Sequence, residues 1–179
     1  MIQNMFTRFR RLFVTQELRL GSGASVLAEV SPNTWRTITP KELAQIVDPP
    51  ARGETLTAAK TLTSADDGKT YFLGAAGGFT VTLPAPYVGG KFRFRVSVAP
   101  TTAYIIVTGS SANILRGGVN ELEVDTGDDG PYQSAGDTFT FVANVAVVGD
   151  FVEMESDGTY WYLNGQTNAD GGSTVTQAS

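Results

Sequence analysis

The sequence predicts a mainly β fold: a single antiparallel β-sandwich of jelly-roll-like type, preceded by an extended N-terminal arm that contains a short helix. Three observations favour this fold. Short runs of β-branched and aromatic residues recur about every 8–12 residues beyond Gly53, which is the rhythm of sandwiches and jelly rolls. Turn residues, among the 20 glycines and 8 prolines of the 179-residue chain, separate these runs. Within the runs, apolar and polar residues alternate with the period of two that half-buried strands have.

The clearest element is a β-hairpin over Phe151–Asn164, FVEMESDGTYWYLN. In its first strand apolar residues alternate with Glu153 and Glu155, and in its second strand Trp161 alternates with tyrosines. Ser156–Gly158 lies between them, and Asp-Gly tolerates the positive φ angles of a tight type I′ turn. We expect this hairpin to close the core of the sandwich, although exposed aromatic rings here could also stack on a sugar.

A second strand is predicted over Lys91–Val98, KFRFRVSV, which alternates strictly. Its phenylalanines and valines are expected to point inward. Three cations are expected to form a basic ladder on its outward side: Lys91, Arg93 and Arg95. The ladder could contact phosphate, an acidic neighbouring subunit or only water. Nucleic-acid binding is disfavoured because the interleaved phenylalanines point to the opposite side and cannot stack on bases.

The pattern divides the chain into an arm over residues 1–50, a β-sandwich domain over 51–166 and a polar tail over 167–179. Within the arm, a short helix is predicted over residues 40–47. Thr39 can cap it and Glu42 completes a capping box, while Pro49-Pro50 cannot continue it. The helix implies no chemistry.

The start of the arm, Met1–Leu20, is basic and amphipathic, with apolar residues at helical spacing. Leu12–Leu20 also alternates well enough to be an edge strand. Such a segment can lie on a membrane, contact nucleic acid, dock on a partner protein or pack against a neighbouring copy; we favour docking on a partner. Six residues are the candidate contacts with a partner protein or a neighbouring subunit: Phe6, Arg8, Phe9, Arg10, Arg11 and Phe13.

Composition restricts the chemistry. The chain has no cysteine, which excludes disulfides and thiolate metal sites, and no histidine, which removes the usual general base and the commonest transition-metal ligand. An enzyme would have to work with carboxylates, lysine or tyrosine alone. No apolar stretch is long enough to span a bilayer.

Charge is unevenly distributed along the chain. Up to Arg95 there are 12 basic and 7 acidic residues, whereas from Val96 onward Arg116 stands against 11 acidic residues. This asymmetry predicts oriented contact with another macromolecule, unless the acids only solvate surface loops.

Two acidic groups are candidates for chemistry. Asp125–Gly130, DTGDDG, could supply some of the oxygen ligands of a calcium ion, but its spacing does not match an EF-hand and a solvated turn is favoured. Glu153 and Glu155 share one side of a strand, as a glycosidase pair could, yet they are also an ordinary outward polar row. No glycine-rich loop opens a helix, so a phosphate cradle is not expected. We therefore predict no catalytic residues, no metal and no cofactor.

Three passages carry a resemblance to a known class: Thr61–Pro86, Lys91–Gly109 and Gly149–Gln166. Together they resemble a β-sandwich module of virion structural proteins of tailed bacteriophages, found in capsid decoration (cement) proteins and in parts of tail fibres. The resemblance covers residues 55–166 and implies a non-enzymatic fold with a role in assembly.

Because the chain is one short module with a basic arm, we expect a capsid decoration protein on the outer surface of the phage head. Its expected partners are the major capsid protein and neighbouring copies of itself, with a trimer as one arrangement; no nucleic acid or membrane is expected. The alternative is a tail-fibre or tail-associated protein that binds a receptor or carbohydrate, whose signature would be exposed Tyr160, Trp161 or Tyr162.

Overall fold

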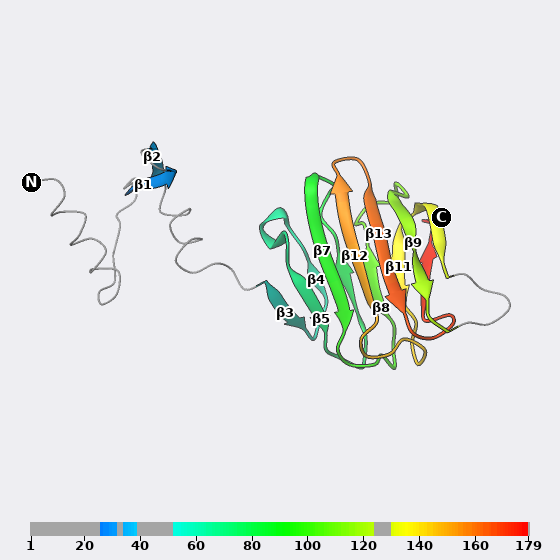
Figure 1. The fold of residues 1–179 in the computed structure, drawn as a ribbon. Coiled ribbons are helices and arrows are strands. Elements are labelled where there is room, and N and C mark those ends of the chain that lie inside the picture. Colours follow the sequence, from blue (N-terminus) through cyan, green and yellow to red (C-terminus); the bar gives the residue numbers. More distant parts are fainter. Residues whose placement is uncertain (1–25, 32–33, 39–51, 124–129, 179) are drawn as a thin grey trace, which may run out of the picture. The chain divides into compact units, whose positions relative to one another are not determined.

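The computed structural model describes residues 26–31, 34–38, 52–123 and 130–178. The chain divides into two compact units, Met1–Pro50 and Ala51–Ser179, each of which is described by itself (Figure 1). In the first unit β1 (Val26–Ser31) pairs antiparallel with β2 (Thr34–Ile38). The predicted helix over residues 40–47 and the six candidate contact residues of the arm lie outside the described residues.

The second unit is built from two β-sheets (Figure 1). The larger has seven strands, in spatial order β10 (Tyr132–Gly136), β9 (Leu115–Glu121), β13 (Trp161–Thr167), β12 (Phe151–Asp157), β7 (Val88–Val96), β5 (Thr70–Leu73) and β3 (Gly53–Leu56). The smaller has five, β14 (Ser173–Thr176), β11 (Thr138–Phe141), β8 (Tyr104–Val107), β6 (Phe79–Thr82) and β4 (Lys60–Thr61). One short 3-10 helix, η1 (Ser64–Asp66), precedes β5. The mainly β prediction is confirmed.

The chain winds back and forth between the sheets from β3 to β8, so that β3, β5 and β7 are neighbours in the larger sheet and β4, β6 and β8 in the smaller one. Neighbours made in this way run parallel. β13 and β9 also pair parallel. The prediction of an antiparallel arrangement is therefore wrong for these pairs, and both sheets are mixed. Each crossover passes through a strand of the opposite sheet, which is the long connection that parallel neighbours need.

β12 and β13 form the predicted hairpin, but its turn is longer than expected. The last strand pair is Ser156 with Trp161, so four residues lie in the loop rather than two. Asp157 explains the difference, because its Oδ1 accepts hydrogen bonds from the backbone N–H of Thr159 at 2.7 Å and of Tyr160 at 2.8 Å. A side chain that satisfies two loop amides stabilises a wider turn than type I′.

The core is one cluster of apolar side chains contributed by both sheets. Trp161 is its largest member and is fully buried; its Nε1 donates to the Pro84 carbonyl oxygen at 3.2 Å. The indole packs against Phe92, with ring centroids 5.5 Å apart, and edge-on against Tyr87 at 6.0 Å. Gly90 lies beneath these rings, where a Cβ would come within 2.9 Å of the indole. The alternation predicted for Lys91–Val98 is confirmed in β7, where Phe92, Phe94 and Val96 are buried. Val98, however, lies beyond the end of β7 and is 39% exposed.

The stretch predicted as a polar tail, residues 167–179, contains a strand. β14 pairs antiparallel with β11, and its Val175 is only 6% exposed. The prediction failed because Ser-Thr-Val-Thr holds a single large apolar residue, which is too little for a strand pattern by itself. The backbone hydrogen bonds to β11 hold this segment as a strand, and its residues belong to the second unit.

Candidate functional site on the outward surface of the seven-stranded sheet

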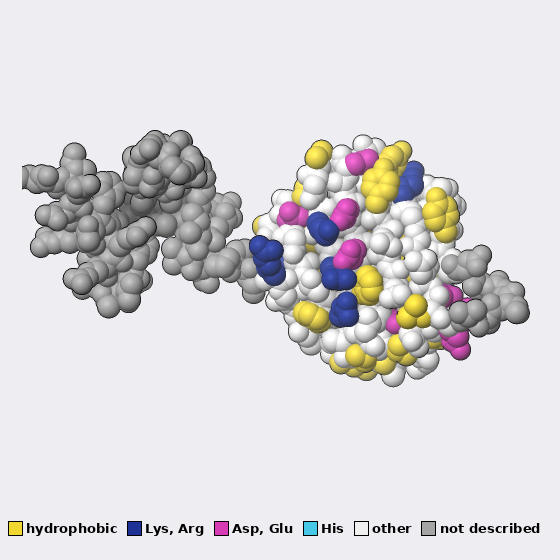
Figure 2. Space-filling view, in the orientation of Figure 1, with side chains coloured by type: hydrophobic (Ala, Val, Ile, Leu, Met, Phe, Trp, Pro, Cys, Tyr) yellow, Lys and Arg dark blue, Asp and Glu magenta, His cyan; other side chains and the backbone are white. Residues whose placement is uncertain are grey.

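Side chains on the outward surface of the larger sheet lie in rows, because the strand register aligns every second residue across the strands. One row runs Lys91, Glu155, Tyr162, Arg116. The next runs Arg93, Glu153, Asn164, Gly118, Tyr132. A third runs Arg95, Phe151, Gln166, Asn120. Figure 2 shows this surface: blue and magenta side chains alternate over β7 and β12, whereas the atoms over β13 and β9 are mostly white, the colour of the backbone and of side chains that are neither charged nor hydrophobic.

On the β7–β12 side, the predicted basic ladder meets the glutamates of the next strand. Lys91 Nζ contacts Glu155 Oε1, and Arg93 Nε lies 2.9 Å from Glu153 Oε1. The hydrogen bond to Glu155 raises the pKa of Lys91 above its ordinary value. The sequence left open what the basic ladder contacts and whether Glu153 and Glu155 form a catalytic pair or an outward polar row. In the structure, Lys91 and Arg93 of the ladder pair with these two glutamates in the same sheet, so the glutamates form an outward row that is engaged by cations.

Two arginines of β7 also lie over the ring of Phe151. The guanidinium carbon of Arg93 lies 4.8 Å from the centre of the Phe151 ring, and that of Arg95 lies 5.3 Å from it. Arg95 makes no ion pair with any described residue, so its charge is held by the ring face alone.

On the β13–β9 side, an arginine stacks on a tyrosine. The guanidinium carbon of Arg116 lies 4.2 Å from the centre of the Tyr160 ring. Its Nη1 donates to the backbone oxygens of Asn113 at 2.7 Å and of Leu115 at 3.1 Å. These contacts fix the guanidinium while its Nε and Nη2 make no hydrogen bond to the described residues, which leaves two oriented donors.

Beside this arginine, Tyr162 is 46% exposed and its hydroxyl donates to Asp157 Oδ2 at 2.9 Å. This bond raises the pKa of Tyr162, while the backbone amides of Tyr160 and Thr159 lower the pKa of Asp157. The tyrosine ring is therefore held at the surface by its hydroxyl, with much of its area open to solvent.

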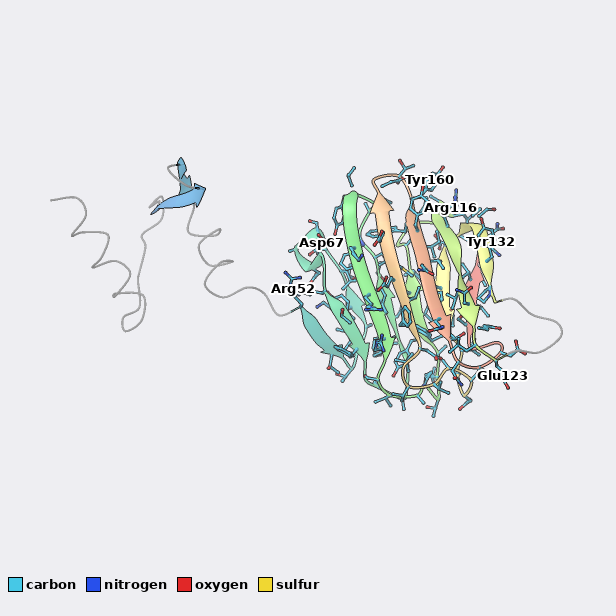
Figure 3. All side chains as sticks on the ribbon, viewed as in Figure 1. Arg52, Asp67, Arg116, Glu123, Tyr132 and Tyr160 are labelled. Carbon is cyan, nitrogen blue, oxygen red and sulfur yellow. The ribbon has the colours of Figure 1, made fainter. Side chains whose placement is uncertain are left out.

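The outward surface of β13 and β9 also carries three amide side chains without hydrogen-bond partners among the described residues. Asn164 and Asn120 are exposed and Gln166 is half-buried, and none of the three amides makes a side-chain hydrogen bond within the described residues. Gly118 lies between Asn164 and Tyr132 in the register and leaves a gap in its row. Tyr132 is 71% exposed and its hydroxyl has no partner in the same part of the chain. Figure 3 places Tyr160, Arg116 and Tyr132 along one margin of the sheet.

A second charged cluster, Glu54, Lys60, Asp66 and Lys69, lies beside the buried Tyr71, whose ring centre is 5.1 Å from Lys60 Nζ. Lys60 Nζ is 2.5 Å from Glu54 Oε1, and Lys69 Nζ is 2.8 Å from Asp66 Oδ1. Burial opposes ionisation of Asp66, but hydrogen bonds from Lys69 and a backbone amide outweigh it and lower the pKa to about 2. The hydrogen bond to Asp66 raises the pKa of Lys69. Both groups stay charged at neutral pH, so neither is suited to transfer a proton as a general acid or base.

Asp150 is a buried carboxylate, only 4% exposed, that ties two loops together. Its Oδ2 accepts from the backbone N–H of Val147 at 2.8 Å, and its Oδ1 from that of Asn168 at 2.9 Å. Burial raises its pKa against the effect of these two bonds. Because both oxygens are engaged by backbone amides, the role of Asp150 is to hold the loops.

The other sites predicted from the sequence have different outcomes. The six arm residues, and residues 125–129 of the predicted acidic stretch Asp125–Gly130, lie outside the described residues. Trp161 is fully buried and cannot stack on a ligand. The described part of the chain holds no group of three carboxylates able to bind a metal ion. It also holds no helix that is long and apolar enough to cross a membrane.

Sequence reasoning missed most of the β13–β9–β10 surface. The alternation of β13 could have placed Tyr162, Asn164 and Gln166 on one side. The contribution of Arg116 and Tyr132 depends on the register of β9 and β10, which no local pattern encodes.

The chain was compared with known proteins. No known protein family matches it, and a search of curated proteins found no match.

Proposed function

We propose that this chain is a structural protein of a tailed-phage virion, of the capsid decoration type. Its β-sandwich unit is displayed on the outer surface of the head and its N-terminal unit attaches it. The observation that carries the proposal is the division of the chain at Pro50 into two compact units. This division fits a protein in which one part is displayed and the other makes the specific contact.

The chemistry of the displayed unit supports a non-enzymatic role. Four of its cations form ion pairs, across strands or within the cluster beside Tyr71, and its buried carboxylate, Asp150, binds backbone amides. In the described residues, Asp66 and Lys69 are locked in their charged states. A rigid unit of this kind suits assembly and display.

Attachment rests on the arm. Phe6, Phe9 and Phe13 would bury apolar surface on the major capsid protein, and Arg8, Arg10 and Arg11 would pair with its acidic residues. A protein that binds only the assembled shell stabilises it by linkage. Contacts with neighbouring copies, as in a trimer, would add to this.

The test is co-sedimentation of the full-length protein with undecorated phage heads, with occupancy and shell melting temperature as readouts. We expect saturable binding that raises the melting temperature. The full-length variants F6S/F9S/F13S and R8E/R10E/R11E should lose occupancy, whereas R95E, a charge reversal on the displayed unit, should keep it. Full occupancy by both arm variants would show that the attachment mechanism is wrong.

A tail-fibre or tail-associated position is the second candidate. The exposed rings of Tyr162 and Tyr132 favour it, although burial of Trp161 removes the strongest sugar platform from the hairpin. Absence of binding to heads, together with binding to purified tails, would decide for this candidate.

A further inference from the structure

We propose that the outward surface of β13, β9 and β10 binds an acidic saccharide, a glycan whose sugars carry carboxylate groups. We call this surface the tyrosine–amide surface, made of Tyr132, Tyr162, Arg116, Asn164, Asn120 and Gln166. The inference concerns the displayed unit alone and holds whether that unit is carried on a head or a tail.

Two exposed tyrosine rings favour a sugar as the ligand of this surface. Tyr162 and Tyr132 are 46% and 71% exposed, and Gly118 lies in the row between Asn164 and Tyr132. Sugar rings present C–H faces that pack on aromatic rings, and a tyrosine combines such an apolar body with a polar tip. A residue larger than glycine at 118 would fill this row, and its Cβ would already come within 2.8 Å of the Pro131 oxygen. The gap is thus built into the strand pairing.

Three amide side chains on the same surface also favour a sugar. An amide side chain offers two donors and an acceptor, which match the adjacent hydroxyls of a sugar. Asn164 and Gln166 are two residues apart on β13, and Asn120 lies opposite Gln166 on β9. In the described residues none of these side chains has a hydrogen-bond partner, so binding breaks no internal bond.

The charge of the surface favours an acidic sugar over a neutral one. The whole chain has a net charge of −5, but the outward surface of β7, β12, β13 and β9 holds more cations than carboxylates. The four cations are Lys91, Arg93, Arg95 and Arg116, and the three carboxylates are Glu153, Glu155 and Asp157. Two of the cations are neutralised by Glu153 and Glu155. The cation on the tyrosine–amide surface is Arg116, whose free Nε and Nη2 can donate in parallel to a carboxylate. Both acids beside Tyr162 are already engaged: Glu155 contacts Lys91, and Asp157 accepts hydrogen bonds from Tyr162 and two backbone amides.

The experiment is a binding assay of the purified full-length protein on an array of bacterial surface polysaccharides, both acidic and neutral, followed by titration of each polysaccharide that binds. We expect acidic polysaccharides to bind. Chemical reduction of their carboxylates to alcohols should weaken binding by about tenfold or more, since a charge-assisted pair is lost.

Variants locate the site. Y132A, Y162A, N164A and R116Q should each weaken binding by about tenfold, on the order expected for one stacking or bidentate contact. R116K keeps the charge but not the forked geometry and should give an intermediate loss. T55A, an exposed change at the far edge of the same sheet on β3, is the matched control and should bind as the wild type does. The melting temperature of each variant shows whether it is folded.

Three results would overturn the proposal. One is that no acidic polysaccharide on the array binds. Another is that binding survives Y132A and Y162A and is abolished only by salt, which would indicate diffuse electrostatic attraction. The third is a concentration-dependent association that N164A abolishes, which would show that the surface binds a second copy of the chain. Head binding, measured on the same variants, should be unchanged, so failure here is distinct from failure of the proposed attachment.

Discussion

The two sides of the β12–β13 hairpin differ completely although they share the same backbone. Inward, Val152, Met154 and Trp161 are fully buried in the core. Outward, Glu153 is paired with an arginine, whereas Tyr162 is 46% exposed to solvent. The period of two thus lets one pair of strands carry both the stability of the unit and its accessible chemistry.

Stability and accessible chemistry can therefore be changed separately in this hairpin. Burial of apolar area is the dominant stabilising contribution, whereas exposed polar groups contribute little to folding. A substitution on the inward side should therefore lower stability, and one on the outward side should change binding.

The largest effect is expected for Trp161→Ala. The substitution removes a fully buried indole and its hydrogen bond to Pro84, and large-to-small changes of this kind cost about 3–5 kcal/mol. Urea unfolding followed by circular dichroism measures the loss. Tyr162→Ala, the adjacent residue on the opposite side, is the control. A loss below about 1 kcal/mol would show that the inward side is not the main source of stability.

An intermediate effect is expected for Asp66→Asn, in the cluster at the margin of the sheet. The folded pKa of Asp66 is about 2, below the ordinary 3.8, so its ionised form favours the folded state. The contribution, about 2 kcal/mol, is present above pH 3.8 and is lost as the pH falls toward 2.

Unfolding free energies of the wild type and Asp66→Asn, measured between neutral pH and about pH 2, test this. The difference should shrink as the pH falls through that window. The exposed Asp170→Asn variant should behave as the wild type. A difference that stays constant with pH would assign the effect to lost packing instead of charge.

A small effect is expected for the outward ion pair of Arg93 and Glu153. Both side chains are about one third exposed, so solvent screens the pair, and a coupling energy of about 0.5 kcal/mol is expected. A double-mutant cycle with Arg93→Ala and Glu153→Ala isolates it. A coupling above about 2 kcal/mol would show that the outward side also stabilises the fold.

The smallest effect on stability is expected for Tyr162→Phe, which removes the hydroxyl that donates to Asp157 but keeps the ring. The melting temperature should equal that of the wild type within error, while binding of an acidic polysaccharide is retained because stacking needs only the ring. Scanning calorimetry and the array assay measure both. Loss of binding with an unchanged melting temperature would assign the recognition to the hydroxyl.

Local patterns in the sequence determined β7 and the β12–β13 hairpin, and the side of the sheet to which their residues point. Alternation in Lys91–Val96 places Phe92 and Phe94 in the core, and the Asp-Gly sequence marks the turn between β12 and β13. Local propensity and the period of two act between residues close in the chain, so they can be recognised without knowledge of the fold.

Only the tertiary structure decided which strands are neighbours. The winding between two sheets, the parallel pairing of β13 with β9 and the recruitment of β14 all join segments far apart in the chain. The same holds for the tyrosine–amide surface, because Arg116, Tyr132 and Asn164 meet through register alone. The physical reason is that strand pairing is selected by burial and by hydrogen bonds between distant segments, whose energies no local pattern contains.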